Sequence, residues 1–451
     1  MNQLLNTGVP AIRPFHVTHR MIVMIAVPMT LAAITTPLLG LVDMGVVGQF
    51  GDAELIGGLA IGALVFDFLL TIFSFLRTGT TGLVAQAMGR EDPLEEQAIF
   101  WRAVIIALVA GILMILCLPL VLSVTDNFMQ ATPATIAAMT TYVSIRILSA
   151  PFALLNYSVL GLLLGRGEGM LGLGLQALLN GINISLSFYL GLVLEWGIAG
   201  VAWGTFIGET VTALIGVSFI YLRFRKVAQP DSKRVFDTQA LLHMVSVNRD
   251  ILIRSFLLLT AFAFFTRAST EMGSVTLAAN SVLLNFFLVI GFFLDGMAMA
   301  AEQITGRAVG AHYSPAFKRG AKLTFLWGMV MTLIVSSLLL LFGNTIIHLL
   351  SKSEDVYLVA VQYLPWAVLT GLTGVLAFHM DGVYIGATWS RDMRNMMFFS
   401  LIFFFAVLYV AKPAMGNHGL WLALNLFLSI RGLTLLALLP ARYRAQFGRG
   451  L

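Results

Sequence analysis

The chain has 451 residues, of which 59% are hydrophobic and only 11% are charged, and its mean hydropathy is +0.90. Soluble domains carry about 25% charged residues, so this composition excludes a soluble globular protein and predicts an all-α integral membrane protein. The net charge of +5 belongs to loops between apolar stretches, so we expect a lipid bilayer around the chain and no nucleic-acid partner.

The apolar stretches predict twelve transmembrane helices, because a helix needs about 20 apolar residues to cross a bilayer. They lie near residues 20–46, 54–80, 98–122, 134–164, 171–194, 198–222, 249–270, 276–306, 320–342, 356–386, 395–411 and 418–440.

The first of these stretches carries one acid, Asp43, and two prolines. A carboxylate inside hydrocarbon is costly, so it indicates a functional group. Pro28 and Pro37 each remove a backbone hydrogen bond and permit the helix to bend. The alternative is that Asp43 lies at the outer membrane edge, close to Asp52, and is simply hydrated.

Polar residues also occur in the fourth and fifth stretches. Arg146 either pairs with an acid in a cavity or serves as a fixed structural cation, and we favour the structural role because intramembrane charges are usually paired. Asn180, Asn183 and Ser187 share one helix face, since their separations are three and four residues. They either bind the Asp43 carboxyl or hydrogen-bond to a neighbouring helix.

Further acids lie in the second half of the chain. Asp295 and Glu302 are seven residues apart and therefore on one face of the eighth stretch, and Asp381 lies late in the tenth. These acids either receive a cationic substrate or form salt bridges that hold a cytoplasmic gate. The role of Asp67, in the second stretch, is open.

Lysine and arginine gather in alternate connections and near both ends, whereas the other connections carry mainly acids. The positive-inside rule therefore predicts that both termini are cytoplasmic. We expect the protein to lie in the inner (cytoplasmic) membrane.

The longest polar connection, from Arg223 to Arg249, divides the spans into six and six. It predicts lobes at residues 1–222 and 249–451, joined by a cytoplasmic linker at 223–248. Glycines repeat between the halves at a constant offset of 221 positions: Gly161 with Gly382, Gly165 with Gly386, and Gly89 with Gly310. Six spans per repeat predict parallel lobes related by a pseudo-twofold axis along the membrane normal. Asp43 has no acidic counterpart, because the same offset leads to Phe264.

Several motifs in the chain resemble the multidrug and toxic compound extrusion (MATE) transporters, and within them the DinF branch. The resemblance covers essentially the whole chain. It is carried by the stretches Pro37–Gly48, Arg146–Pro151, Leu294–Ala298 with Glu302, Asp381–Thr388 with Met393–Asn395, and Asn417–Leu424. It implies two six-helix lobes that export amphiphilic organic cations against a proton or sodium gradient.

The same resemblance places the family's functional residues on positions of this chain. The acid of the first helix falls on Asp43, the bending proline on Pro28, the asparagine of the fourth helix on Asn156 and the threonine of the sixth on Thr205. The fifth-helix pattern Asn-x2-Asn-x3-Asp reads Asn180, Asn183 and Ser187 here, so a second acid is missing.

These observations favour a proton-coupled antiporter that exports amphiphilic cations by alternating access, because the ionisable residues of the spans are mostly acidic. A lone carboxyl among neutral hydrogen-bond partners suits a proton carrier, whereas Na⁺ usually needs more charge nearby. Two alternatives are a sodium-coupled exporter with Na⁺ at Asp43, and a lipid-linked precursor flippase. The sequence carries no motif for an enzyme, a resident metal or a cofactor, and we expect a monomer.

Overall fold

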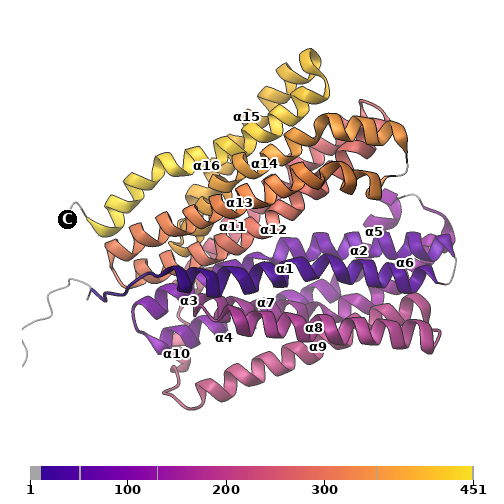
Figure 1. Ribbon diagram of the computed structural model, residues 1–451. Helices are drawn as coiled ribbons and strands as arrows, with labels where there is room; N and C mark the ends of the chain where they lie inside the picture. The colour runs from indigo at the N-terminus through magenta and orange to yellow at the C-terminus, as the bar shows by residue number, and fades with distance from the viewer. Residues whose placement is uncertain (1–11, 50–51, 130, 352, 449–451) are drawn as a thin grey trace, which may run out of the picture.

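The computed structural model describes residues 12–49, 52–129, 131–351 and 353–448, and these residues form helices and loops without a β-strand (Figure 1). The helices are α1 (His19–Gly48), α2 (Ala53–Phe73), α3 (Phe75–Gly89), α4 (Pro93–Leu116), α5 (Leu118–Met129), α6 (Pro133–Arg146), α7 (Ala150–Gly165), α8 (Gly169–Phe188), α9 (Gly197–Phe224), α10 (Ser232–Val235), α11 (Thr238–Thr270), α12 (Ser274–Gly310), α13 (Ser314–Leu350), α14 (Glu354–Gly386), α15 (Ser390–Met415) and α16 (Asn417–Phe447).

The predicted spans are confirmed. Eleven described helical segments are long and apolar enough to cross a membrane, and α1, with 30 residues, supplies the twelfth. The predicted third span, 98–122, contains most of α4 and the first turn of α5, with a break at Cys117. Two further predicted spans are each built from two helices. The second is α2 followed by α3, with a break at Ser74, and the fourth is α6 followed by α7, with a 3-10 turn at Ile147–Ser149. Pro151, the second residue of α7, lacks the N–H that would continue the preceding helix.

Helix α1 is continuous through Pro28 and Pro37, so the two prolines do not break it in this state. Pro28 is buried, while the side chain of Pro37 lies outside the described residues. Each proline still removes one backbone donor from the helix, so the predicted capacity to bend remains a prediction.

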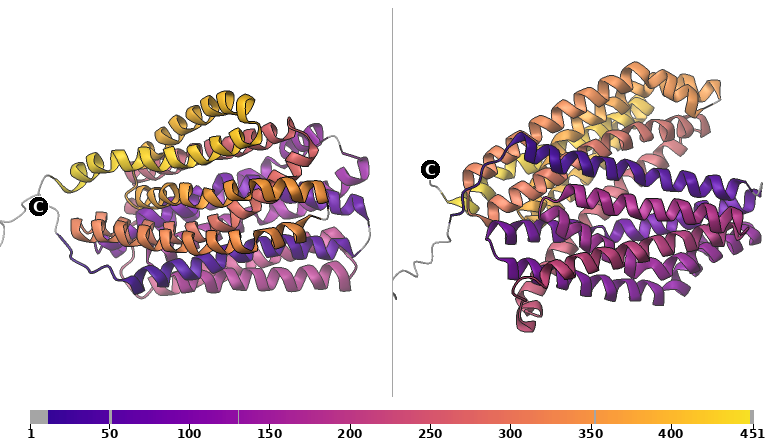
Figure 2. Two further views of the ribbon diagram at one scale, coloured as in Figure 1. Left: turned by 45° about the horizontal axis from the view of Figure 1, so that its top comes forward. Right: turned by 60° about the horizontal axis from the view of Figure 1, so that its bottom comes forward.

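Two separate hydrophobic cores divide the helices into two lobes. One core joins side chains from Val46 to Phe224 and also takes in the first part of α11 (Met244, Val247 and Ile251), and the other joins side chains from Ala261 to Leu428. A third, smaller core joins the start of α1 to α12, α13 and α14 across the lobes. Figures 1 and 2 show the corresponding helices side by side, with α1 to α9 in one group and α11 to α16 in the other. The twelve helices thus form two six-helix lobes, as predicted. The boundaries at residues 222 and 249 stay a prediction.

The lobes meet through a reciprocal pair of glycine contacts that reflects the sequence repeat. A Cβ on Gly89 of α3 would lie 2.1 Å from the Arg307 carbonyl oxygen, and one on Gly310 of α12 would lie 1.9 Å from that of Gln86. Gln86 and Arg307 are themselves 221 positions apart, the offset of the repeat. Each lobe therefore presents an equivalent glycine to the other, as a pseudo-twofold axis between α3 and α12 requires.

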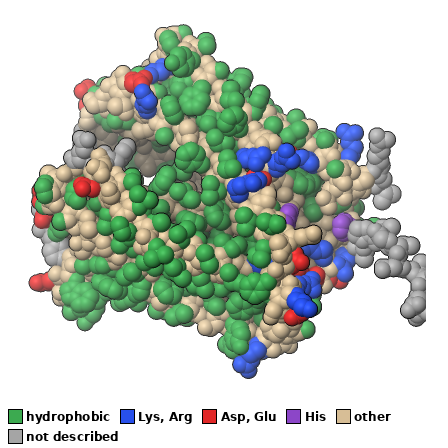
Figure 3. Space-filling model, turned by 180° about the vertical axis from the view of Figure 1, so that it is seen from behind, with side chains coloured by type: hydrophobic (Ala, Val, Ile, Leu, Met, Phe, Trp, Pro, Cys, Tyr) green, Lys and Arg blue, Asp and Glu red, His purple; other side chains and the backbone are tan. Residues whose placement is uncertain are grey.

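The lobes are closed at the end where the helices carry most of their lysines and arginines. There Gln86 of α3 donates to the carbonyl oxygen of Gly386 (2.9 Å), and Val17, Ile22 and Ile25 pack with α12 and α13. Both the start of α1 and the end of α16 lie at this end (Figure 1). At the opposite end, Figure 3 shows a hollow between the two halves of the molecule.

Candidate functional site

Asp43 lies near the C-terminal end of α1, five residues before the helix ends, and it is only 8% exposed. Its Oδ1 atom is buried and has no hydrogen-bond partner among the described residues. Ser187 of α8 lies beside the Asp43 carboxyl group. The carboxyl group of Asp43 is therefore enclosed by the lobe.

The amide and hydroxyl groups predicted around Asp43 form a buried network between α8 and α9. Ser187 Oγ lies 3.4 Å from Asn183 Oδ1, and Asn183 Nδ2 donates to Thr205 Oγ1 at 2.8 Å. Asn180 Nδ2 reaches across to α1 and donates to Thr35 Oγ1 at 2.7 Å. The close packing that allows this network depends on Gly204, where a Cβ would lie 2.7 Å from the Ser187 nitrogen.

A buried ion pair lies next to this network. Arg146 of α6 donates to Glu209 of α9 at 2.9 Å and stands over the ring of Phe66 at 4.8 Å. Asn156 of α7 donates to the backbone carbonyl of Glu209 at 3.1 Å, so it supports the helix that carries the acid and not Asp43 directly. Asp67, on α2, is exposed.

A second group of charges lines a cavity of about 120 Å³ between the lobes. Its walls come from α3 of one lobe and from α11, α12 and α14 of the other, and its charged members are Arg77, Arg254, Asp295, Glu302 and Asp381. Arg254 and the buried Arg431 of α16 both bind Asp381. Asp381 thus belongs to an internal salt-bridge cluster, one of the two roles left open by the sequence.

The two acids of α12 differ in their surroundings. Glu302 is 2% exposed, and its Oε1 atom has no hydrogen-bond partner among the described residues. Asp295 is exposed to the cavity. No ion pair within 4 Å involves either acid in the described part of the chain, so both remain able to receive a cation or a proton.

Four of these charged residues are absent from the site expected from the sequence: Glu209, Arg77, Arg254 and Arg431. Three of the four are arginines, so the cavity is not as acidic as the sequence suggested. Arg77 and Arg254 line the cavity together with Asp295, Glu302 and Asp381, and Arg431 pairs with Asp381 from outside the cavity lining. A search for basic as well as acidic residues within the apolar stretches would have found all of them.

Two six-helix lobes with buried ionisable residues between and within them define a multi-pass membrane protein built like a transporter. A solved structure described as the outward-facing conformation of a multidrug resistance MATE family transporter superposes with a TM-score of 0.86 at 17% identity. The match covers 94% of this chain and 96% of the other. That similarity establishes the fold.

The MatE family model matches residues 28–189 and 251–410, and the chain belongs to this family of multidrug transporters. It is 34% identical to DNA damage-inducible protein F of Escherichia coli K12 over 428 residues, which cover 93% of this chain and 92% of that protein. It is also 22% identical to a probable multidrug resistance protein NorM of Chromobacterium violaceum, over 95% of each chain.

Proposed function

We propose that this protein is a proton-coupled antiporter that exports amphiphilic organic cations from the cytoplasm by alternating access. In this proposal it lies as a monomer in the inner membrane, with both termini in the cytoplasm. One observation carries the proposal: Asp43 is enclosed among neutral partners, and one of its carboxylate oxygens lacks a donor. A buried carboxylate oxygen without a donor is costly, and binding a proton removes that cost.

The choice of ion follows from the charge of this site. Sodium requires several oxygen ligands, and Ser187 stands where a second acid would have supplied both charge and oxygen. The side chains of Asn183, Ser187 and Thr205 are already joined by hydrogen bonds, since Asn183 Oδ1 accepts from Ser187 and Asn183 Nδ2 donates to Thr205 Oγ1. A sodium ion would have to break this network, whereas a proton on Asp43 leaves it intact.

The charges of the ionisable residues around Arg146 in the first lobe favour a cationic cargo. Asp43, Asp67 and Glu209 outnumber Arg146 there, which leaves a negative charge when all four are ionised. Loss of the Asp43 charge on protonation would weaken the attraction for a cation. Proton entry from outside and release of the cargo would thereby be coupled through one carboxyl group.

The arrangement of the two lobes is consistent with the step of the transport cycle at which the cargo leaves the protein. Contacts close the basic end, while the opposite end is hollowed (Figure 3). Asp43 lies in the outer part of α1, on the side from which external protons would arrive. Pro28 and Pro37 supply the weakened backbone positions at which α1 would bend when the charge of Asp43 changes.

The second candidate is a flippase for lipid-linked precursors, and the arginines of the cavity favour it. Arg77 and Arg254 both line the cavity and would attract a phosphate. Arg254, however, already binds Asp381, and the cavity is lined by three acids against two arginines. The charge available to a phosphate is therefore small, and we favour the cation exporter.

Expression in a host without its own efflux pumps tests the proposal. We expect cells that contain the protein to retain less ethidium and to tolerate more of it than cells with an empty vector. Collapse of the proton gradient should restore retention. Unchanged retention across a panel of cationic dyes, with the protein present in the membrane, would contradict the assignment.

A further inference from the structure

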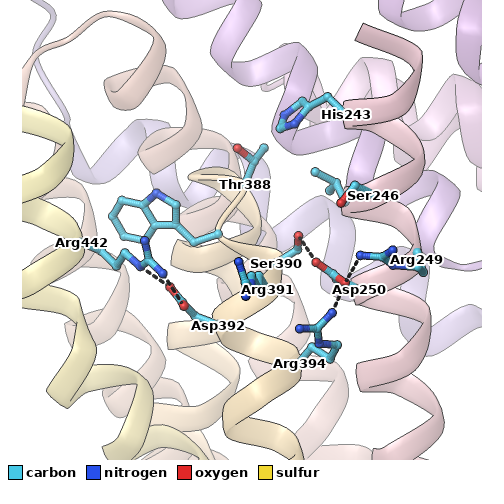
Figure 4. Close-up of a pocket in the computed structure, with 12 residues that line it drawn as sticks. His243, Ser246, Arg249, Asp250, Thr388, Ser390, Arg391, Asp392, Arg394 and Arg442 are labelled. Carbon is cyan, nitrogen blue, oxygen red and sulfur yellow. Dashed lines mark hydrogen bonds and ion pairs between the residues drawn. The ribbon is translucent and has the colours of Figure 1, made fainter. Parts of the chain in front are cut away.

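A basic pocket lies at the closed end of the second lobe, outside the cavity between the lobes. Its volume is about 490 Å³, and its walls come from the start of α11, the turn from α14 to α15, the first turn of α15 and the end of α16. Figure 4 shows its side chains. The charged and imidazole groups are His243, Arg249, Asp250, Arg391, Asp392, Arg394 and Arg442.

The pocket holds four arginines and two aspartates, so it has an excess of two positive charges with His243 neutral. Asp250 accepts from Arg394 at 2.8 Å and from Arg249 at 3.2 Å. Arg442 binds Asp392. Two aspartates thus fix the positions of three arginines, and these pairs leave a net positive charge in the pocket.

The fourth arginine, Arg391, takes part in none of these ion pairs. It lines the pocket between the Asp250 and Asp392 pairs (Figure 4), is exposed, and makes no ion pair with any described residue. It belongs to the first turn of α15, where no side chain caps the helix and no carbonyl of the described residues accepts from the Ser390 or Arg391 N–H. Unpaired N–H groups at a helix start add to the attraction for an anion.

Exposed apolar side chains continue from the arginines along both helices that form the pocket. On α15, Phe398 is 56% exposed and lies two turns beyond Arg391 on the same face, and Ile402 follows at 56%. On α11, Phe256 is 55% exposed and lies seven residues beyond Arg249. From Arg391 to Ile402 the helix rises about 16 Å, a distance comparable to half the hydrocarbon thickness of a bilayer.

We propose that this pocket binds the phosphate of an anionic phospholipid, with the acyl chains along the exposed faces of α11 and α15. The arginines and the start of α15 hold the phosphate, and the apolar columns below them select a lipid over a soluble anion. Basic pockets between transmembrane helices on the cytoplasmic side are suited to such headgroups. The pocket lies at the end that positive-inside topology assigns to the cytoplasm.

Lipid binding to the purified full-length protein tests this directly, by native mass spectrometry during titration with dioleoyl phosphatidylglycerol. We expect tighter binding than for dioleoyl phosphatidylcholine, and no displacement by equimolar glycerol phosphate. Each arginine near a phosphate contributes about a fivefold change in affinity. Arg391→Gln should weaken binding about fivefold and Arg249→Gln with Arg391→Gln about 25-fold.

Arg225→Gln is the matched control, because Arg225 is an exposed arginine just beyond the end of α9 and outside the pocket. It should bind phosphatidylglycerol as the parent does. Equal binding by the double variant and the parent, or equal binding of the two lipids, would overturn the proposal. Competition by glycerol phosphate would also overturn it, since the ligand would then be a soluble phosphate. The readout is independent of transport, so it stands apart from the proposed export activity.

Discussion

Replacing Asp43 with asparagine is expected to reduce gradient-driven dye efflux in proteoliposomes to the level of empty vesicles. Asparagine has nearly the same shape as the protonated acid, so it can occupy the same buried position beside Ser187. It cannot release a proton, however, and it removes the negative charge that attracts the cargo. The protein should therefore fold and insert normally but remain unable to complete a coupled cycle. Dye fluorescence after imposing a pH gradient measures the effect.

Asp126→Asn is the matched control for this change. Asp126 lies in α5 of the same lobe, is exposed, and makes no hydrogen bond or ion pair through its side chain within the described residues. Its substitution should leave efflux at the parental rate. Parental efflux by the Asp43→Asn protein would show that the titrating group lies elsewhere, with Glu302 as the next candidate because its Oε1 is also buried without a partner.

The second large effect is expected on stability. Asp381→Asn should destabilise the protein by about 3–5 kcal/mol, because it leaves Arg254 and Arg431 side by side without their shared counter-charge. Arg431 is only 2% exposed, so water cannot replace the lost partner. Thermal denaturation of the detergent-solubilised protein, followed by size-exclusion chromatography, measures the change.

Combining Asp381→Asn with Arg431→Met should recover most of this loss, since the remaining Arg254 lines the cavity and can reach water. Asp355→Asn serves as the control. Asp355 lies in the first turn of the same helix and is exposed, so its loss should cost at most about 1 kcal/mol. Equal stability of the Asp381→Asn protein and the control would mean that the charge cluster does not hold this lobe together.

The fold could be predicted from the sequence because its main determinants are local. A stretch of about 20 apolar residues can only be a helix in a bilayer, and the turns between such stretches carry the charges. The glycine repeat also predicted that the two lobes are related by a pseudo-twofold axis. Gly89 and Gly310 face each other's helices because close approach of two backbones leaves no room for a Cβ. The breaks at Ser74 and at Ile147–Ser149 could not be predicted, since both lie within continuous apolar stretches.

The candidate site was only partly predictable, because pairing depends on helices that are distant in the sequence. Asp43, Asn183, Ser187 and Thr205 do lie together, as the resemblance implied. The partner of Arg146 is Glu209, 63 residues away, and those of Asp381 are Arg254 and Arg431. No spacing rule connects such residues. Their positions follow from lobe packing, and only the high cost of isolated charges in hydrocarbon indicates that partners must exist.

The central claim is that protons drive export through Asp43. The most direct test is transport of a cationic dye into inverted vesicles, or across the membrane of proteoliposomes, under an imposed pH gradient in a sodium-free buffer. The account predicts that dye movement follows the size and direction of the pH gradient, needs no sodium, and is accompanied by alkalinisation of the compartment that supplies protons. Dye movement that requires a sodium gradient and does not respond to the pH gradient would contradict it.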